Sequence, residues 1–171
     1  MPKVVPGILS KLAIRQETLE VLDLGCGPGN LKDYTSFKRY VGVDLSSEML
    51  REAGESGYSE LIEAAMEEYA ASPLAQKADG VFVMSATYFL NSTDLTKFIT
   101  DIDRLAKKFW ILSFDNISDK IRALYREQGI ETFNHCGTAV PWEDCRRIPS
   151  SGWYSVPTDE EVGMELIVRS K

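Results

Sequence analysis

The sequence predicts an α/β protein in which a mostly parallel β-sheet carries helices on both of its faces. Short apolar runs rich in β-branched residues recur along the 171 residues, and segments with helical spacing of apolar residues separate them. The runs are apolar almost throughout, as strands are when helices bury both faces of a parallel sheet. A chain of this length buries one core without disulfides or metals, so we expect a single domain over residues 1–171.

Five runs are predicted as strands in chain order: residues 20–24, 40–43, 80–84, 109–114 and 165–168. In open sheets of this kind, ligands bind beyond the carboxyl ends of the strands. The residues that directly follow each strand are therefore the first candidates for a functional site.

Three helices are predicted between the strands, because apolar residues recur there every three or four positions. The clearest covers residues 93–106, with Ser92 and Thr93 as candidate N-caps. A second covers residues 118–128, and a third begins after Ser46. Alternation of such helices with strands is typical of a doubly wound fold.

Residues 139–161 fit neither a helical nor a strand period. A loop of about twenty residues inside a compact domain is usually functional or disordered. Trp142, Trp153 and Tyr154 argue against disorder, because disordered segments are poor in aromatic residues. We therefore expect a functional loop.

Composition and charge exclude several functions. The net charge of −7 disfavours a nucleic-acid partner, and no apolar run reaches the ~20 residues that a membrane span needs. One histidine and three cysteines without zinc spacing disfavour a metal site. The N-terminus has no secretory signal pattern, and unpaired cysteines suit a reducing compartment, so we expect a cytoplasmic protein.

A glycine-rich motif follows the first predicted strand. Gly25, Gly27 and Gly29 allow a sharp turn and let a ligand lie against the main chain, at the start of a helix expected near Asn30. Asp44 ends the second predicted strand, where a carboxylate can accept both hydroxyls of a ribose. The motif therefore predicts a nucleoside ligand.

Two kinds of nucleoside ligand compete for this motif. The dinucleotide fingerprint G-x-G-x-x-G/A would place Asn30 where a very small residue is needed. Asp23 would also repel a pyrophosphate, whereas it suits a ligand with an amino group and a sulfonium. A nicotinamide-dependent oxidoreductase is therefore the less favoured alternative.

Residues 23–29 (DLGCGPG) and 42–50 (GVDLSSEML) resemble two motifs of the class I S-adenosylmethionine-dependent methyltransferases. Residues 78–84, 95–105 and 108–114 resemble later strands and a helix of that family more weakly. The resemblance implies a Rossmann-like, doubly wound, seven-stranded sheet. Its last strand, here about residues 162–169, would insert antiparallel.

The resemblance also implies roles at a cofactor site. Asp23 would lie near the methionine amino group of S-adenosylmethionine, the three motif glycines would line its methionine and ribose, and Asp44 would bind the ribose diol. Ala65 stands where the family usually has an Asp for adenine, so adenine binding would use the backbone and packing on Met66. The other candidate cofactor contacts are Gly25, Cys26, Gly27, Gly29, Leu45, Met49 and Ser85.

Residues 84–90 (MSATYFL) come at the end of the segment that resembles the fourth strand of the family. They lack the signatures of amide, base and metal-dependent catechol methylation, and so resemble the ubiquinone-pathway-like, type 11/25 group that methylates small molecules. The expected reaction moves a methyl group to O, N or C of a small, neutral or cationic acceptor. The candidate catalytic residues are Tyr88 and His135, the latter on a sixth strand at 133–137.

Only a short helix, at about residues 8–16, is expected before the first strand, which would be a minimal N-terminal lid. Residues 139–161 would then close the acceptor site with their aromatic side chains. We expect a monomer or homodimer. The alternative is a degenerate family member that acts as a non-catalytic binding or regulatory module.

Overall fold

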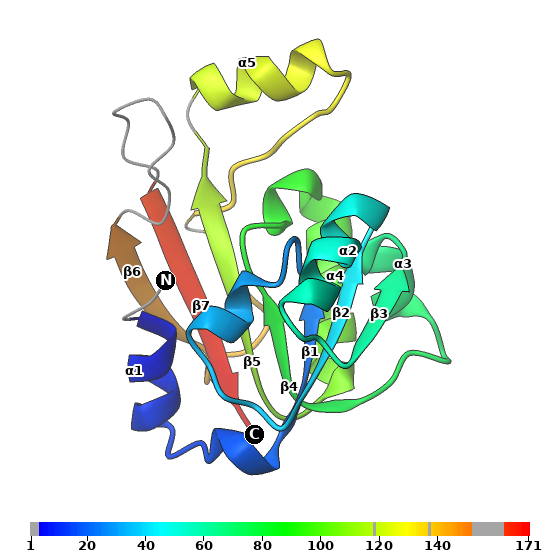
Figure 1. Cartoon of the computed structure of the whole chain (residues 1–171). Helices are drawn as coiled ribbons and strands as arrows, with labels where there is room; N and C mark the ends of the chain where they lie inside the picture. The colour runs from blue at the N-terminus through cyan, green and yellow to red at the C-terminus, as the bar shows by residue number, and fades with distance from the viewer. Residues whose placement is uncertain (1–3, 118, 137, 152–162) are drawn as a thin grey trace.

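The computed structural model describes residues 4–117, 119–136, 138–151 and 163–171. Its sheet has the strand order β3-β2-β1-β4-β5-β7-β6 (Figure 1). The strands are β1 (Glu20–Leu24), β2 (Arg39–Asp44), β3 (Glu60–Glu63), β4 (Ala78–Val83), β5 (Ala106–Asn116), β6 (Arg146–Ser151) and β7 (Gly163–Ser170). β7 runs antiparallel to both of its neighbours, and the other pairs are parallel. The predicted seven-stranded sheet with an antiparallel last strand is confirmed.

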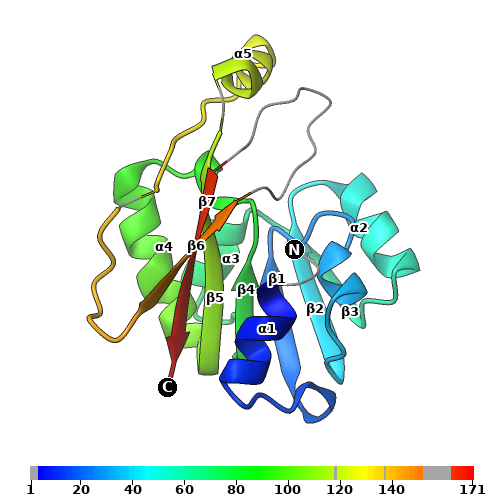
Figure 2. The same cartoon turned by 90° about the vertical axis from the view of Figure 1, so that its left-hand side faces the viewer.

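Helices cover both faces of the sheet, as the apolar strands predicted. They are α1 (Val4–Lys11), α2 (Ser47–Glu55), α3 (Met66–Ala71), α4 (Ser92–Leu105) and α5 (Asp119–Glu127). In Figure 2, α1 lies over one face of the sheet and α3 lies behind the other. Apolar side chains of α1 and α2 join one buried cluster, and those of α3 and α4 join the other. α5 lies beyond the carboxyl end of β5 and buries no residue. No helix in the described ranges is long and apolar enough to cross a membrane.

The predicted helices 93–106 and 118–128 correspond to α4 and α5, and local hydrogen bonds set their starts. The N-cap of α4 is Asn91, one residue before the expected caps, and its side chain accepts hydrogen bonds from Thr93 N and Asp94 N. The third predicted helix is α2, and Ser46 caps it by accepting a hydrogen bond from Met49 N. Capping of this kind satisfies N–H groups that have no partner within the helix.

The helix expected near Asn30 is only one turn long. A single 3₁₀ turn, η2 (Asn30–Asp33), stands there, and only Leu31 in it is buried. Without an apolar stripe a longer helix has nothing to pack against the sheet. Gly29 enters this turn with φ +87, and a Cβ on it would lie 2.9 Å from the ring of Tyr58.

The sixth strand is not at residues 133–137, where the sequence predicted it. Residues 133–136 have no regular structure, and the sixth strand is β6, inside the predicted loop 139–161. β6 pairs only with β7, so it is an edge strand, where Pro149 is tolerated although it lacks an N–H. Ile148 of β6 packs against the cluster on the α1 face.

Trp142 packs on the α4 face of the sheet, and its contact with an acceptor stays a prediction. Its ring meets Trp110 of β5 edge-on at 6.0 Å, and the Arg169 guanidinium lies 4.5 Å from its centroid. Arg169 also pairs with Asp103 of α4 at 2.7 Å, which ties β7 to the helix. The other two aromatic residues predicted for the lid, Trp153 and Tyr154, lie outside the described residues.

We expect Trp142→Ala to lower the free energy of unfolding by about 1–3 kcal/mol, because it removes the contacts with Trp110 and Arg169. Urea denaturation measures this change. Binding of S-adenosylhomocysteine should be unaffected, since the partners of Trp142 belong to β5 and β7, whereas the glycine loop and Asp44 follow β1 and β2. Weaker ligand binding without a loss of stability would contradict this placement.

Candidate active site

The glycine loop leaves β1 and is tied directly to β2. Gly25 N and Cys26 N both donate hydrogen bonds to Val43 O, at 2.8 and 3.0 Å. Gly25 and Gly27 have φ values of +71 and +52, which residues with a Cβ rarely adopt. The predicted turn is therefore present at the carboxyl ends of adjacent strands.

Two of the glycines are needed for different reasons. A Cβ on Gly25 would lie 2.6 Å from Ala86 Cβ, so any side chain there would displace the segment that follows β4. Beside Gly27, by contrast, no atom of the described residues other than its chain neighbours lies within 4 Å of the place that a Cβ would take. The space next to Gly27 is thus open to a ligand.

Asp44 ends β2 and holds two segments together. Its Oδ2 accepts a hydrogen bond from Gly27 N at 2.8 Å, and its Oδ1 accepts one from Ser46 N at 2.9 Å. A carboxylate has about four lone-pair sites, so both oxygens of Asp44 keep acceptor capacity. Leu45 follows directly with 72% of its side chain surface exposed, and Met49 is half-buried in the first turn of α2.

Asp23 lies within the sheet and has a partner that the sequence did not suggest. It is only 2% exposed, and its Oδ2 accepts a hydrogen bond of 2.5 Å from the Tyr58 hydroxyl. Tyr58 comes from the connection between α2 and β3 and lies against Gly29. The structure does not expose Asp23 at the open side of the loop, so its contact with a cofactor amino group stays a prediction.

Burial changes the acidity of three neighbouring groups. It raises the pKa of Asp23 to about 7; the hydrogen bond from Tyr58 opposes this shift, and the charge of Asp44 adds to it. Burial likewise raises the pKa of the Cys26 thiol and of the Tyr58 hydroxyl. Cys26 therefore stays a thiol, and it packs within the loop with its Sγ 3.5 Å from Gly27 O.

The residues predicted for adenine lie between β3 and α3. Ala65 is the N-cap of α3 and is half-buried. Met66 is 7% exposed and packs in the cluster on the α3 and α4 face, with its Sδ 3.6 Å from the Cβ position of Gly25. Both residues adjoin the glycine loop, and their contact with adenine stays a prediction.

Sequence reasoning missed a polar network at the ends of β4 and β5. Ser113 Oγ accepts a hydrogen bond from Ser85 N at 2.7 Å and donates to Asp115 Oδ2 at 3.1 Å. Ser85 has a left-handed φ of +57, and Thr87 Oγ1 donates to Ser113 O at 2.6 Å. Ser113 and Asp115 follow the apolar run Phe109–Leu112 near the end of β5, and polar residues at that position were the signal that could have identified them.

Two atoms of this network are buried without a hydrogen-bond partner. They are Ser85 Oγ and Asp115 Oδ1, and no other side-chain atom among the described residues shares this state. Burial also raises the pKa of Asp115 to about 6, against the opposing effect of the hydrogen bond from Ser113. Such unpaired buried groups are unusual, and they often mark a functional site.

An aromatic patch lies beside this network and consists of Tyr88, Phe89 and Tyr125. Tyr88 and Phe89 belong to the 3₁₀ turn η3 (Thr87–Phe89), and their ring centroids are 4.3 Å apart. Phe89 meets Tyr125 of α5 edge-on at 5.5 Å and is 42% exposed. The predicted residue Tyr88 is thus placed at the carboxyl end of β4, next to exposed apolar surface.

His135 is buried, and one of its ring nitrogens is held by a backbone carbonyl. It is 1% exposed, its Nε2 lies 2.7 Å from Leu90 O, and its ring adjoins Phe114 and Phe133. A carbonyl only accepts, so Nε2 carries the proton and donates it. This contact is structural, and a role of His135 in catalysis stays a prediction.

The comparisons with known proteins agree with this geometry. A family model described as "Methyltransferase domain" matches residues 21–108, just over half of the chain. The chain belongs to this methyltransferase family. Curated protein sequences give no match. Within the described residues, no group of three or more His, Cys, Asp or Glu could hold a metal ion.

Solved methyltransferases share the fold at low sequence identity. Magnesium protoporphyrin IX methyltransferase from Synechocystis PCC 6803, with bound S-adenosylhomocysteine, has a TM-score of 0.65 at 19% identity, over 99% of this chain and 83% of that one. The N-methyltransferase NodS from Bradyrhizobium japonicum WM9, also with S-adenosylhomocysteine, has a TM-score of 0.60 at 14% identity, over 97% and 87%. A putative RNA methyltransferase from Pyrococcus horikoshii has a TM-score of 0.63 at 15% identity, over 96% and 80%.

By family and fold, the chain is a class I methyltransferase, an enzyme class whose cofactor is S-adenosylmethionine. The glycine loop, Asp44 and the polar network lie at the carboxyl ends of β1, β2, β4 and β5, where open α/β sheets bind ligands. Family and fold thus agree with the expectation from residues 23–29 and 42–50.

The raised pKa of Asp23 predicts how the stability of this methyltransferase depends on pH. The folded chain keeps the Asp23 proton up to about pH 7, whereas the unfolded chain loses it near pH ~4. The contribution is therefore complete below pH ~4 and is lost as the pH rises to about 7. Asp23→Asn should remove this decline, which we expect to amount to about 2–4 kcal/mol.

Denaturation curves at several pH values measure this effect. Asp33→Asn is the matched control, because Asp33 is exposed and its substitution changes the net charge by the same amount. An equally steep loss of stability between pH 4 and 7 in Asp23→Asn and the parent would show that Asp23 is not the group responsible.

Proposed function

We propose that this protein transfers a methyl group from S-adenosylmethionine to O, N or C of a small-molecule acceptor. The observation that carries the proposal is the open space beside Gly27, next to a carboxylate that keeps acceptor capacity. A nucleoside needs both features, because its ribose must approach the main chain closely while its two hydroxyls find acceptors.

The described residues fit the cofactor in three respects. Asp44 is half-buried at the end of β2 and can accept hydrogen bonds from a ribose diol. Leu45 offers exposed apolar surface to a flat base, and Gly27 leaves room for close approach. When bound, the cofactor supplies a methyl group on a sulfonium, already activated for in-line displacement.

The chain's own contribution is to hold the acceptor and to accept its proton. Ser85 Oγ and Asp115 Oδ1 are unpaired at the carboxyl ends of β4 and β5, and an ionised carboxylate can only accept. An acceptor O–H or N–H would satisfy Asp115, which would then take the proton as the nucleophile loses it. Holding the acceptor in place can supply a further ~7–11 kcal/mol.

The two predicted catalytic residues have different places in this proposal. Tyr88 would contact the acceptor, because it lies in the aromatic patch at the end of β4. His135 would support the wall of the site through its hydrogen bond from Nε2 to Leu90 O, and Nδ1 would then be the ring nitrogen that could accept a proton.

A small-molecule acceptor is supported by two structural neighbours whose names state such a role, a magnesium protoporphyrin IX methyltransferase and the N-methyltransferase NodS. The net charge of −7 favours such an acceptor over RNA, although one neighbour is a putative RNA methyltransferase.

We further propose one domain, a monomeric or homodimeric state and a cytoplasmic location. The alternative of a non-catalytic module is not favoured by the family match.

Asp44→Ala should weaken the binding of S-adenosylhomocysteine about tenfold or more, because charged hydrogen bonds to the ribose are worth ~1.5–3 kcal/mol each. Isothermal titration calorimetry measures the affinity, and circular dichroism verifies the fold. Asp33→Ala, an exposed residue of η2, is the charge-matched control and should bind as the parent does. Absence of binding to the parent at millimolar ligand would overturn the proposed cofactor site.

Alanine at Gly25 and at Gly27 should have different consequences. Gly27→Ala costs only ~1–2 kcal/mol of backbone strain, but it places a methyl group in the open space and should weaken S-adenosylhomocysteine binding. Gly25→Ala adds a clash with Ala86 to a similar strain, so it should lower stability more than Gly27→Ala does. Thermal melting and calorimetry on both variants separate the effects. Full affinity in Gly27→Ala would mean that the ligand lies elsewhere.

A further inference from the structure

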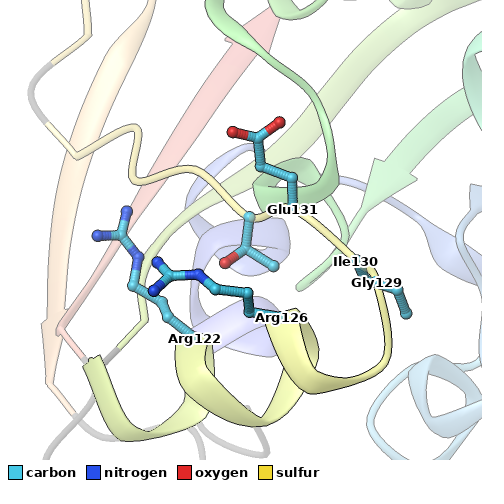
Figure 3. A pocket seen from close by; sticks show the side chains of 6 residues that line it. Arg122, Arg126, Gly129, Ile130 and Glu131 are labelled. Atoms are coloured by element: carbon cyan, nitrogen blue, oxygen red, sulfur yellow. The ribbon is translucent and has the colours of Figure 1, made fainter.

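A cavity of about 360 Å³ lies between α5 and the segment that follows it. Its lining consists of Arg122, Arg126, Gly129, Ile130, Glu131 and Thr132. Figure 3 shows the guanidinium groups of Arg122 and Arg126 pointing to the same side of α5, while the Glu131 carboxylate points away from them. The volume falls in the ~300–1,000 Å³ range of small-molecule sites.

The positive charge in this cavity is poorly compensated within the chain. Arg122 and Arg126 are four residues apart on one helix, a spacing at which like charges repel. Arg122 pairs with Asp119 only at 3.9 Å, and the Asp119 side chain is fully exposed. Arg126 makes no ion pair with any residue that the structure describes. An anion between the two guanidinium groups would relieve this repulsion.

The segments that line the cavity also contact the aromatic patch of Tyr88, Phe89 and Tyr125. Phe133 N, directly after the cavity residue Thr132, donates a hydrogen bond of 2.8 Å to Tyr88 O. Tyr125 of the same helix packs on Phe89, which is 42% exposed. Apolar aromatic surface and a pair of arginines therefore adjoin each other above the carboxyl ends of β4 and β5.

We propose that this cavity binds the carboxylate or phosphate group of the methyl acceptor, whose flat apolar part lies on Tyr88, Phe89 and Tyr125. Guanidinium groups suit this task, because they bind both anions through paired N–H donors. The inference rests on the proposed methyl-transfer function and names its acceptor as an apolar acid. It replaces the neutral or cationic acceptor that the net charge suggested, since the local charge at α5 is positive.

Three probes test the cavity on the intact protein: benzoate, inorganic phosphate, and benzamide as the neutral counterpart of benzoate. Chemical shift changes of the α5 backbone amides, followed by NMR titration, report where each probe binds and how tightly. The variants are Arg126→Gln and Arg122→Gln. Arg15→Gln is the matched control, because Arg15 is an exposed arginine before β1, at the opposite end of the sheet.

We expect benzoate, phosphate or both to shift the α5 signals, and benzamide to bind much more weakly. Arg126→Gln should weaken anion binding about fivefold or more, while Arg15→Gln should leave it unchanged. Phosphate binding without benzoate binding would assign the site to a phosphorylated acceptor. Equal binding of benzamide and benzoate, unchanged affinity in both α5 variants, or no anion binding at millimolar concentration would each overturn the proposal.

Titration with S-adenosylhomocysteine in the same samples keeps this proposal separate from the proposed function. If the parent binds S-adenosylhomocysteine but no anion, only the assignment of the cavity fails. If it binds anions at α5 but no S-adenosylhomocysteine, the methyl-transfer function fails and the identification of the anion as its acceptor fails with it.

Discussion

The site depends on the two hydrogen bonds that Asp44 accepts at the end of β2. One comes from the glycine loop at Gly27 and the other from Ser46, the cap of α2. A single carboxylate thus fixes the loop after β1 relative to the helix after β2. Charge-assisted bonds to backbone N–H groups are strong, so the loop is set before any ligand arrives. The open space beside Gly27 exists because Asp44 holds the loop in this position.

The sequence predicted those parts of the fold that local patterns determine. The apolar runs identified five of the seven strands, and apolar spacing identified α2, α4 and α5. β6 escaped detection because Arg146–Ser151 has no strand pattern of its own: it begins with two arginines and contains a proline. The glycine-rich motif also suggested a helix near Asn30. Only the 3₁₀ turn η2 forms there, because the following residues carry no apolar stripe.

The candidate site was predictable where a motif names its residues and not where tertiary packing decides. Gly25 and Gly27 lie in the loop after β1 and Asp44 lies at the end of β2, as the motifs predicted, while their contacts with a cofactor stay a prediction. The partner of Asp23 could not be foreseen, because Tyr58 lies 35 residues away and reaches it only through the packing of α2. The cavity on α5 was equally hidden, since it depends on how the segment after that helix returns past Tyr88.

The position of β7 also has a consequence for how the chain folds. β7 lies between β5 and β6, and β6 pairs with no other strand. Until β7 docks, β5 presents an unpaired edge rich in apolar residues, and Arg146–Ser151 has no strand to join. An incompletely paired sheet edge is a template for association with another chain. Closure of the sheet is therefore a late, non-local step, and the interval before it is when this protein is most exposed to aggregation.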